Sequence, residues 1–106
     1  MGPKTVELCD KLRETSSLLK SVGEHHWAGW LDKSLSRIER SDLLGVEYLL
    51  GAYGGMGSFR DLVTMSANGH SGTEQDYRDV NGRLDTLRSE IYELARHIRR
   101  NAVVPE

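Results

Sequence analysis

Apolar residues recur at intervals of three and four over the last third of the chain, and this repeat constrains the fold most. It consists of Tyr77, Val80, Leu84, Leu87, Ile91, Leu94 and Ile98. Such spacing places the side chains on one stripe of an α-helix and lasts for three heptads. Thr73 and Asp76 are spaced as a capping box at its start. We therefore predict one long amphipathic helix, in which Gly82 would let another helix approach closely.

Shorter periodic segments predict three further main helices and one short helix upstream. The predicted helices cover residues 5–23, 24–40, 43–53 and, as a short helix of about two turns, 59–65. Thr5 is the expected N-cap of the first, with residues 1–4 frayed. The segment 43–53 is apolar on all sides, so we place it at the centre. The prediction is an all-α protein: one domain, residues 1–106, forming a small antiparallel bundle of four main helices plus the short one.

A glycine-rich stretch, residues 51–57, separates the third helix from the short one. Glycine reaches positive φ without steric cost, so a glycine here is expected to end the third helix. Ser58 is the predicted cap of the next helix, accepting the Asp61 N–H, with Met56 and Leu62 as a hydrophobic staple. The residues that we assign to this structural turn are Gly54, Gly55, Gly57, Ser58 and Asp61.

The same stretch has a second interpretation, as an anion site. The N–H groups of residues 57–59 lie at a predicted helix N-terminus, where a phosphate or carboxylate can bind. However, no strand precedes the stretch, the Lys-Ser/Thr pair of a P-loop is absent, and the glycine spacing is not that of a dinucleotide site. The plain turn is the favoured interpretation, and a small-ligand or phosphate site is the alternative.

Composition excludes several classes of function. The net charge of −2, from 14 Lys+Arg and 16 Asp+Glu, argues against nucleic acid as a partner. No apolar run approaches the ~20 residues that a membrane span needs, and no signal peptide is evident. The single cysteine, Cys9, lies on the apolar side of the first predicted helix, where we expect a buried thiol. We expect a cytoplasmic protein that does not bind membranes.

No set of residues predicts catalysis or metal binding. His25 and His26 are adjacent and diverge by ~100° on a helix, while His70 and His97 are isolated, so we expect exposed histidines and no metal site. No serine lies on a strand–turn–helix elbow. The loop 66–73 is polar, lacks any core-forming residue and is the expected mobile segment. We predict no catalytic residues, no cofactor and no enzymatic activity.

Two aromatic residues lie away from the predicted core. Trp30 is at the edge of the apolar stripe of its helix, and Tyr92 lies beside the long seam. Tryptophan and tyrosine dominate binding hot spots. Partial burial at the margin of the bundle is the competing interpretation for each. The candidate partner-binding residues are Trp30, His26, Tyr92 and Arg60.

One string carries a resemblance. Residues 54–59, Gly-Gly-Met-Gly-Ser-Phe, followed by Asp61 and Leu62, resemble the signature of a family of short bacterial proteins of unknown function. That family also has an upstream helix with Trp-Ala and Leu, which Trp27-Ala28 and Leu31 resemble. The similarity spans about residues 20 to 65, and Arg60 departs from it, since a smaller polar residue is expected there. Small acidic proteins of this sort are often encoded beside toxin genes and act as immunity proteins. The resemblance implies the same role for this chain.

These observations lead to a ranked set of functional hypotheses. The first is a protein-binding module, an immunity protein that occludes the active site of a cognate toxin, with acidic side chains meeting a basic cleft. The second is a structural module that forms a homodimer through its long apolar seam. The third is a small-ligand or phosphate-binding domain at the glycine-rich turn.

Overall fold

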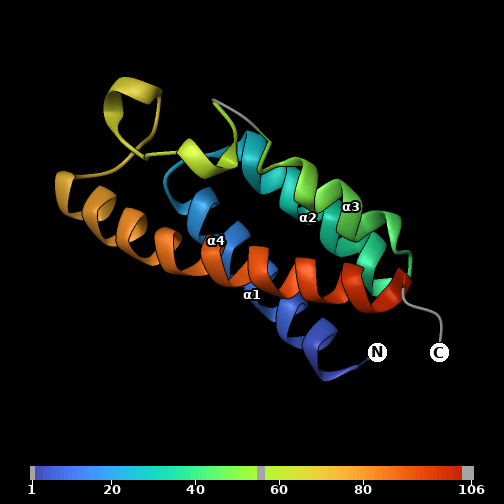
Figure 1. Ribbon diagram of the computed structural model, residues 1–106. Helices are drawn as coiled ribbons and strands as arrows, with labels where there is room; N and C mark the ends of the chain where they lie inside the picture. The colour runs from blue at the N-terminus through green and yellow to red at the C-terminus, as the bar shows by residue number, and fades with distance from the viewer. Residues whose placement is uncertain (1, 55–56, 104–106) are drawn as a thin grey trace.

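The computed structural model describes residues 2–54 and 57–103, which form an antiparallel bundle of four α-helices (Figure 1). The helices are α1 (Pro3–Ser21), α2 (His25–Glu39), α3 (Leu44–Gly51) and α4 (Glu74–Val103), with 3-10 turns at Phe59–Asp61 and Ser66–Asn68. No strand occurs in these ranges, so the predicted all-α class is confirmed. Consecutive helices run in opposite directions, and α1 starts at the end of the bundle where α4 finishes (Figure 1).

The first helix begins earlier than predicted and ends as predicted. Pro3 is its first residue and Gly2 its N-cap. The expected cap at Thr5 is therefore wrong, and Pro3 and Lys4 are helical instead of frayed. Proline suits this position because its missing N–H would have no helical partner. At the other end Gly23 has φ 77°, and the Glu24 N–H reaches back to the Leu19 carbonyl at 2.9 Å. This geometry turns the chain directly into α2.

The long apolar repeat is buried within the chain. Its buried members are Tyr77, Val80, Leu84, Leu87, Ile91 and Leu94, with Ile98 partly buried. They lie on α4, which packs against α1 and α3. The predicted capping box is confirmed: the Thr73 N–H donates to Asp76 Oδ2 at 2.8 Å and the Asp76 N–H to Thr73 Oγ1 at 3.1 Å. Because the stripe is already covered, a homodimer would have to use another surface.

The third helix is peripheral, which contradicts its predicted central position. Val46 and Leu49 point inward, but Leu43 and Leu44 at its start are 54% and 66% exposed. The helix packs against α2 and α4, the same two neighbours that α1 has, so α3 forms one side of the bundle and is not enclosed by the other three helices. An apolar residue on every side of a short helix therefore does not show that every side is covered. Within the described ranges, no helix is both long and apolar enough to cross a bilayer.

The glycine that permits a close helix approach is Gly45 on α3, not Gly82. A Cβ at Gly45 would lie 2.7 Å from Arg37 Cβ and 3.0 Å from the Ile38 backbone nitrogen, both on α2. A Cβ at Gly82 would meet nothing within 4 Å. The predicted role of Gly82 is therefore wrong, and its position on α4 is open to solvent.

Replacing Gly82 with alanine is expected to stabilise the protein by about 1 kcal/mol, because glycine is that much less favourable in a helix interior. Urea unfolding of both proteins measures the difference. Gly29→Ala is a matched control, since Gly29 is also helical and exposed with nothing within 4 Å of its Cβ position. A loss of stability in either variant would show that the site is crowded.

Candidate functional site

A cleft of about 200 Å³ lies where the glycine-rich segment meets the start of α2. Its lining residues are Glu24, Trp27, Gly57, Ser58, Asp61, Leu62, Val63, Asn68 and His70. Since a water occupies about 30 Å³ of liquid, the cleft has room for one long side chain or a handful of waters. It combines a half-buried indole ring, two carboxylates and a small apolar wall.

One wall of the cleft is the predicted turn, with different hydrogen bonds. Ser58 caps the turn as predicted, but its Oγ accepts the Arg60 N–H at 3.3 Å, not the Asp61 N–H. The Asp61 N–H bonds instead to the Ser58 carbonyl at 3.0 Å. Residues 59–61 thus form a single 3-10 turn, and Leu62 is already extended. The predicted two-turn helix over 59–65 is wrong, because the Thr64 N–H and carbonyl bond to the Asn81 side chain on α4 instead of continuing a helix.

The glycines contribute less to the end of α3 than predicted. The helix ends at Gly51, and Ala52 and Tyr53 continue it as 3-10-type bonds to the Leu49 and Leu50 carbonyls. Of the three glycines of this stretch that the structure describes, Gly51, Gly54 and Gly57, only Gly57 has a positive φ, of 74°. Gly54 therefore does not close the helix, and the Phe59 N–H secures the end by donating to the Ala52 carbonyl at 2.9 Å. The predicted roles of Gly55 and Met56 lie outside the described residues.

Of the three backbone N–H groups proposed for an anion, those of Gly57 and Phe59 are already engaged. The Gly57 N–H donates to Asp61 Oδ2 at 3.0 Å, and the N–H groups of Phe59 and Arg60 have the acceptors named above. The Asp61 carboxylate thus takes the place of an external anion at the Gly57 N–H. Glu24 and Asp61 line the cleft, and no described lysine or arginine does. The cleft is suited to a cation rather than a phosphate.

His70 is buried, contrary to the predicted exposure, with its side chain 4% exposed. Its Nε2 lies 2.9 Å from Glu24 Oε1, and its Nδ1 lies 3.0 Å from the Met65 nitrogen. The same Nδ1 also lies 3.1 Å from the Met65 carbonyl oxygen, so both ring nitrogens have partners. The other oxygen, Glu24 Oε2, accepts the Trp27 N–H at 3.0 Å and caps α2. With both ring nitrogens engaged, His70 is a structural group and not an available base.

The pair formed by Glu24 and His70 anchors the loop that was predicted to be mobile. The Ser71 N–H donates to the Val22 carbonyl at 2.9 Å, and the Tyr77 hydroxyl donates to the His70 carbonyl at 2.8 Å. The loop therefore has a core-forming residue, contrary to expectation, and that residue is a histidine. Glu24 and His70 are 46 positions apart, and no spacing rule in the sequence connects them.

The Glu24 carboxyl makes stability depend on pH. Burial opposes its ionisation, but the hydrogen bonds from the Trp27 N–H and His70 outweigh burial and hold the Glu24 pKa below its ordinary value. A depressed folded pKa contributes stability that is complete above the unfolded value, about 4.3, and is lost as pH falls through the folded value.

We expect Glu24→Gln to lower the free energy of unfolding by about 1 to 2 kcal/mol near neutral pH, since it weakens a cap and a charged hydrogen bond. At about pH 3 the difference should fall to about half or less, because the wild-type carboxyl becomes protonated. Urea unfolding at both pH values measures it. Glu93→Gln, at an exposed glutamate with no hydrogen bond in the described residues, is the control. A difference that does not change with pH would contradict the assignment.

A second hollow, of about 240 Å³, lies on the other side of the glycine-rich turn and brings two predicted partner-binding residues together. It is lined by Tyr53, Arg60, Arg88, Ser89 and Tyr92, and we call it the arginine hollow. The Arg60 guanidinium is 5.3 Å from the centroid of the Tyr92 ring. Arg88 joins the turn to α4, because its Nη1 donates to the carbonyls of Phe59 and Leu62, each at 2.9 Å.

The other two predicted partner-binding residues lie together on α2. The His26 and Trp30 rings have centroids 6.4 Å apart. Trp30 is half-buried, stacks on Tyr48 at 4.7 Å and donates its Nε1–H to the Tyr48 carbonyl at 2.8 Å. The four candidates thus form two pairs. They are connected by successive ring contacts at 4.9–5.7 Å through Trp30, Trp27, Phe59, Tyr53 and Tyr92.

The remaining candidates for chemistry are structural. Cys9 is buried as predicted, and burial raises the pKa of its thiol, so the reactive thiolate is disfavoured. Within the part of the chain that the structure describes, no three His, Cys, Asp or Glu side chains are grouped so as to hold a metal ion. The residues of the cleft that sequence reasoning missed are Glu24, Trp27, Asn68 and His70.

Comparison with known proteins gives one match. A family described as a domain of unknown function (DUF6966) matches residues 20–73. No curated protein and no solved structure matches significantly. The matched segment stops one residue before α4 begins, and it contains every residue that lines the cleft. The α4 residues of the arginine hollow lie outside it.

Proposed function

The chain belongs to the DUF6966 family of domains of unknown function, which matches half of its length, and we propose that this segment is a protein-binding module whose cleft takes a basic side chain of the partner. The observation that carries the proposal is the composition of the cleft. Trp27, Glu24 and Asp61 line the cleft together, and no described lysine or arginine lines it. A lysine or arginine placed there gains from both the carboxylates and the aromatic face.

Asp61 is the group that would contact the incoming cation. It is exposed, and only its Oδ2 is engaged, by the Gly57 N–H, so Oδ1 has no hydrogen-bond partner among the described residues. Glu24 contributes charge from deeper in the cleft, where both its oxygens are bonded. Val63, 49% exposed, offers an apolar rim for the aliphatic part of the partner's side chain.

We propose a cognate bacterial toxin as the partner, and the cytoplasm as the place where the two meet. The family resemblance of residues 54–62 implies an immunity protein, and an acid-lined cleft fits the basic surface that such a pairing requires. Inhibition would result from covering the active site of the toxin. That mode of action requires no catalytic group on this chain, in keeping with the engagement of both His70 nitrogens.

The test is calorimetric titration with the product of the neighbouring gene, together with survival of cells that express that gene. Asp61→Asn keeps an oxygen for the Gly57 N–H but removes the charge, and Val63→Lys adds a cation at the rim. Each should weaken binding about tenfold or more, which is the effect of losing one charged contact.

Asp79→Asn is the matched control, because Asp79 is an exposed aspartate that also accepts one hydrogen bond, from Gln75, and lies outside the family segment. It should bind and protect like the wild type. Absence of any complex and of any protection would reject the toxin as partner. A complex of equal strength in all three variants would reject the cleft as the binding site.

A further inference from the structure

Two consecutive residues of the 3-10 turn that follows the glycine-rich stretch line two hollows of opposite charge. Asp61 lines the cleft, and Arg60 lines the arginine hollow with Tyr53, Arg88, Ser89 and Tyr92. We propose that the arginine hollow is a binding site for a small oxyanion, the chemistry shared by phosphate monoesters and carboxylates. This site is independent of the protein partner proposed above, and it differs from an anion site on the backbone of the turn.

Two guanidinium groups are available to the anion. Arg60 and Arg96 lie 5.3 Å and 5.5 Å from the centroid of the same Tyr92 ring. Within residues 2–54 and 57–103, neither has a carboxylate within 4.0 Å. Arg60 lines the arginine hollow, whereas Arg96, one turn after Tyr92 on α4, lies near the same ring but outside the lining residues. Guanidinium forks match the geometry of phosphate and carboxylate oxygens.

Arg88 adds a fixed positive charge beneath them. Its side chain is only 14% exposed, held by the Phe59 and Leu62 carbonyls and by an ion pair to the more exposed Asp85. Tyr53 forms the floor: its hydroxyl donates to the Arg88 carbonyl at 2.7 Å, and burial raises the Tyr53 pKa, so the ring stays neutral. None of the lining residues is acidic. Asp85 pairs with Arg88, whereas Arg60 and Arg96 have no such ion pair among the described residues.

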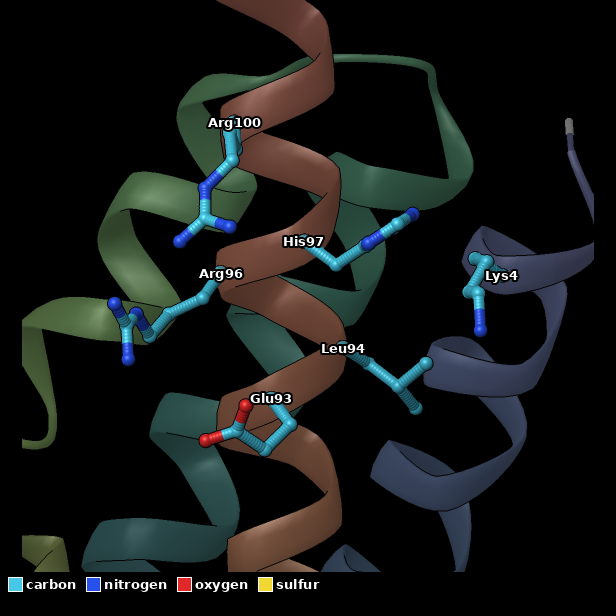
Figure 2. A pocket seen from close by; sticks show the side chains of 6 residues that line it. All are labelled: Lys4, Glu93, Leu94, Arg96, His97 and Arg100. Atoms are coloured by element: carbon cyan, nitrogen blue, oxygen red, sulfur yellow. The ribbon is translucent and has the colours of Figure 1, made fainter.

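The cationic surface continues along α4. Arg96 lines a separate, open hollow of about 290 Å³ over the last turns of α4. Figure 2 shows that Arg96 and Arg100 lie on one side of the helix, whereas His97 points toward Lys4 of α1. Glu93, one turn before Arg96, is the acidic residue of this outer hollow. Arg96 and Arg100 therefore extend the positive charge of the arginine hollow along α4.

The test is a titration of the intact protein, followed by NMR of its amide groups and by calorimetry, with inorganic phosphate, a hexose 6-phosphate and acetate at equal ionic strength. Saturable binding with shifts at Arg60, Ser89 and Tyr92 is the expected result. A preference for the phosphates identifies a phosphorylated ligand, and equal binding of acetate identifies a carboxylate; both outcomes support the site.

Arg60→Gln and Arg96→Gln should each weaken binding about tenfold or more, and the double variant should abolish it. Arg83→Gln is the matched control, since Arg83 is an exposed arginine of α4 that pairs with Glu14 away from the hollow. Thermal unfolding confirms that each variant is folded. Absence of saturable binding, or binding unchanged in both Arg60 and Arg96 variants, would overturn the proposal. Neither result bears on the protein partner, because no partner is present.

Discussion

Replacing Phe59 with alanine is expected to lower the free energy of unfolding by about 4 kcal/mol, the range for truncating a buried phenylalanine. Phe59 is 0% exposed and is the largest fully buried side chain. Its ring lies 5.7 Å from Trp27 and 5.6 Å from Tyr53, so one residue joins the turn to two helical segments. The surrounding rings cannot collapse into the space, because Trp27 belongs to α2 and the Tyr53 hydroxyl is bonded to the Arg88 carbonyl on α4.

Thermal and urea unfolding measure the effect, and the melting temperature should fall by about 15 °C or more. Phe59→Leu is the control, since it keeps most of the apolar volume and should cost no more than about 1.5 kcal/mol. Trp27 fluorescence in the folded variant also reports on the cleft, whose wall the Phe59 ring supports. A Phe59→Ala protein within 1 kcal/mol of the wild type would mean that the turn is not packed against the bundle.

Gly45→Ala should destabilise the protein by about 2 kcal/mol, although alanine is the better helix former. The added Cβ would lie 2.7 Å from Arg37 Cβ and 3.0 Å from both the backbone nitrogen and Cγ1 of Ile38. Two of these atoms are fixed parts of α2, so α3 itself must move away. That movement opens the contact between α2 and α3, which a favourable helix propensity of about 1 kcal/mol cannot offset.

The Gly82→Ala variant provides the opposite sign for the same substitution. Both glycines are helical, but a Cβ meets neighbouring atoms only at Gly45. Urea unfolding of the two variants should therefore place the wild type between them. If Gly45→Ala is as stable as Gly82→Ala, the two helices are farther apart than the structure shows.

The elements that were predictable from the sequence are those fixed by local chemistry. The stripe on α4 and the Thr73–Asp76 box depend on neighbours three or four residues away, and both are confirmed. Ser58 was identified as a cap for the same reason. Its partner was misassigned because a single 3-10 turn and an α-helix begin with the same residue pattern.

The errors arise where a distant partner decides. Nothing near His70 in sequence indicates that Glu24 lies 2.9 Å from its ring. The most apolar helix is likewise expected at the centre of the bundle, whereas α3 forms one side of it, against α2 and α4, and leaves Leu44 exposed. Periodicity states which residues can be buried and does not state which helix will cover them.

The candidate sites show the same division. Arg60 and Tyr92 were selected separately, for their residue types, and the structure brings them within 5.3 Å. The cleft was not anticipated, since Trp27, Asp61 and His70 come from three separate segments. The sequence correctly indicates a turn capped by Ser58. Its alternative interpretation as an anion site does not fit, because the Asp61 carboxylate already accepts the Gly57 N–H.

Because Arg88 donates to the carbonyls of Phe59 and Leu62, the family segment depends on a residue that lies outside it. The arginine belongs to α4, which starts just after the segment ends at residue 73. A fragment cut at that boundary would leave two carbonyls without their donor and the inner side of α3 without cover. A fragment of this chain that ends at residue 73 would therefore need a separate helix, with a basic residue placed to donate to these two carbonyls.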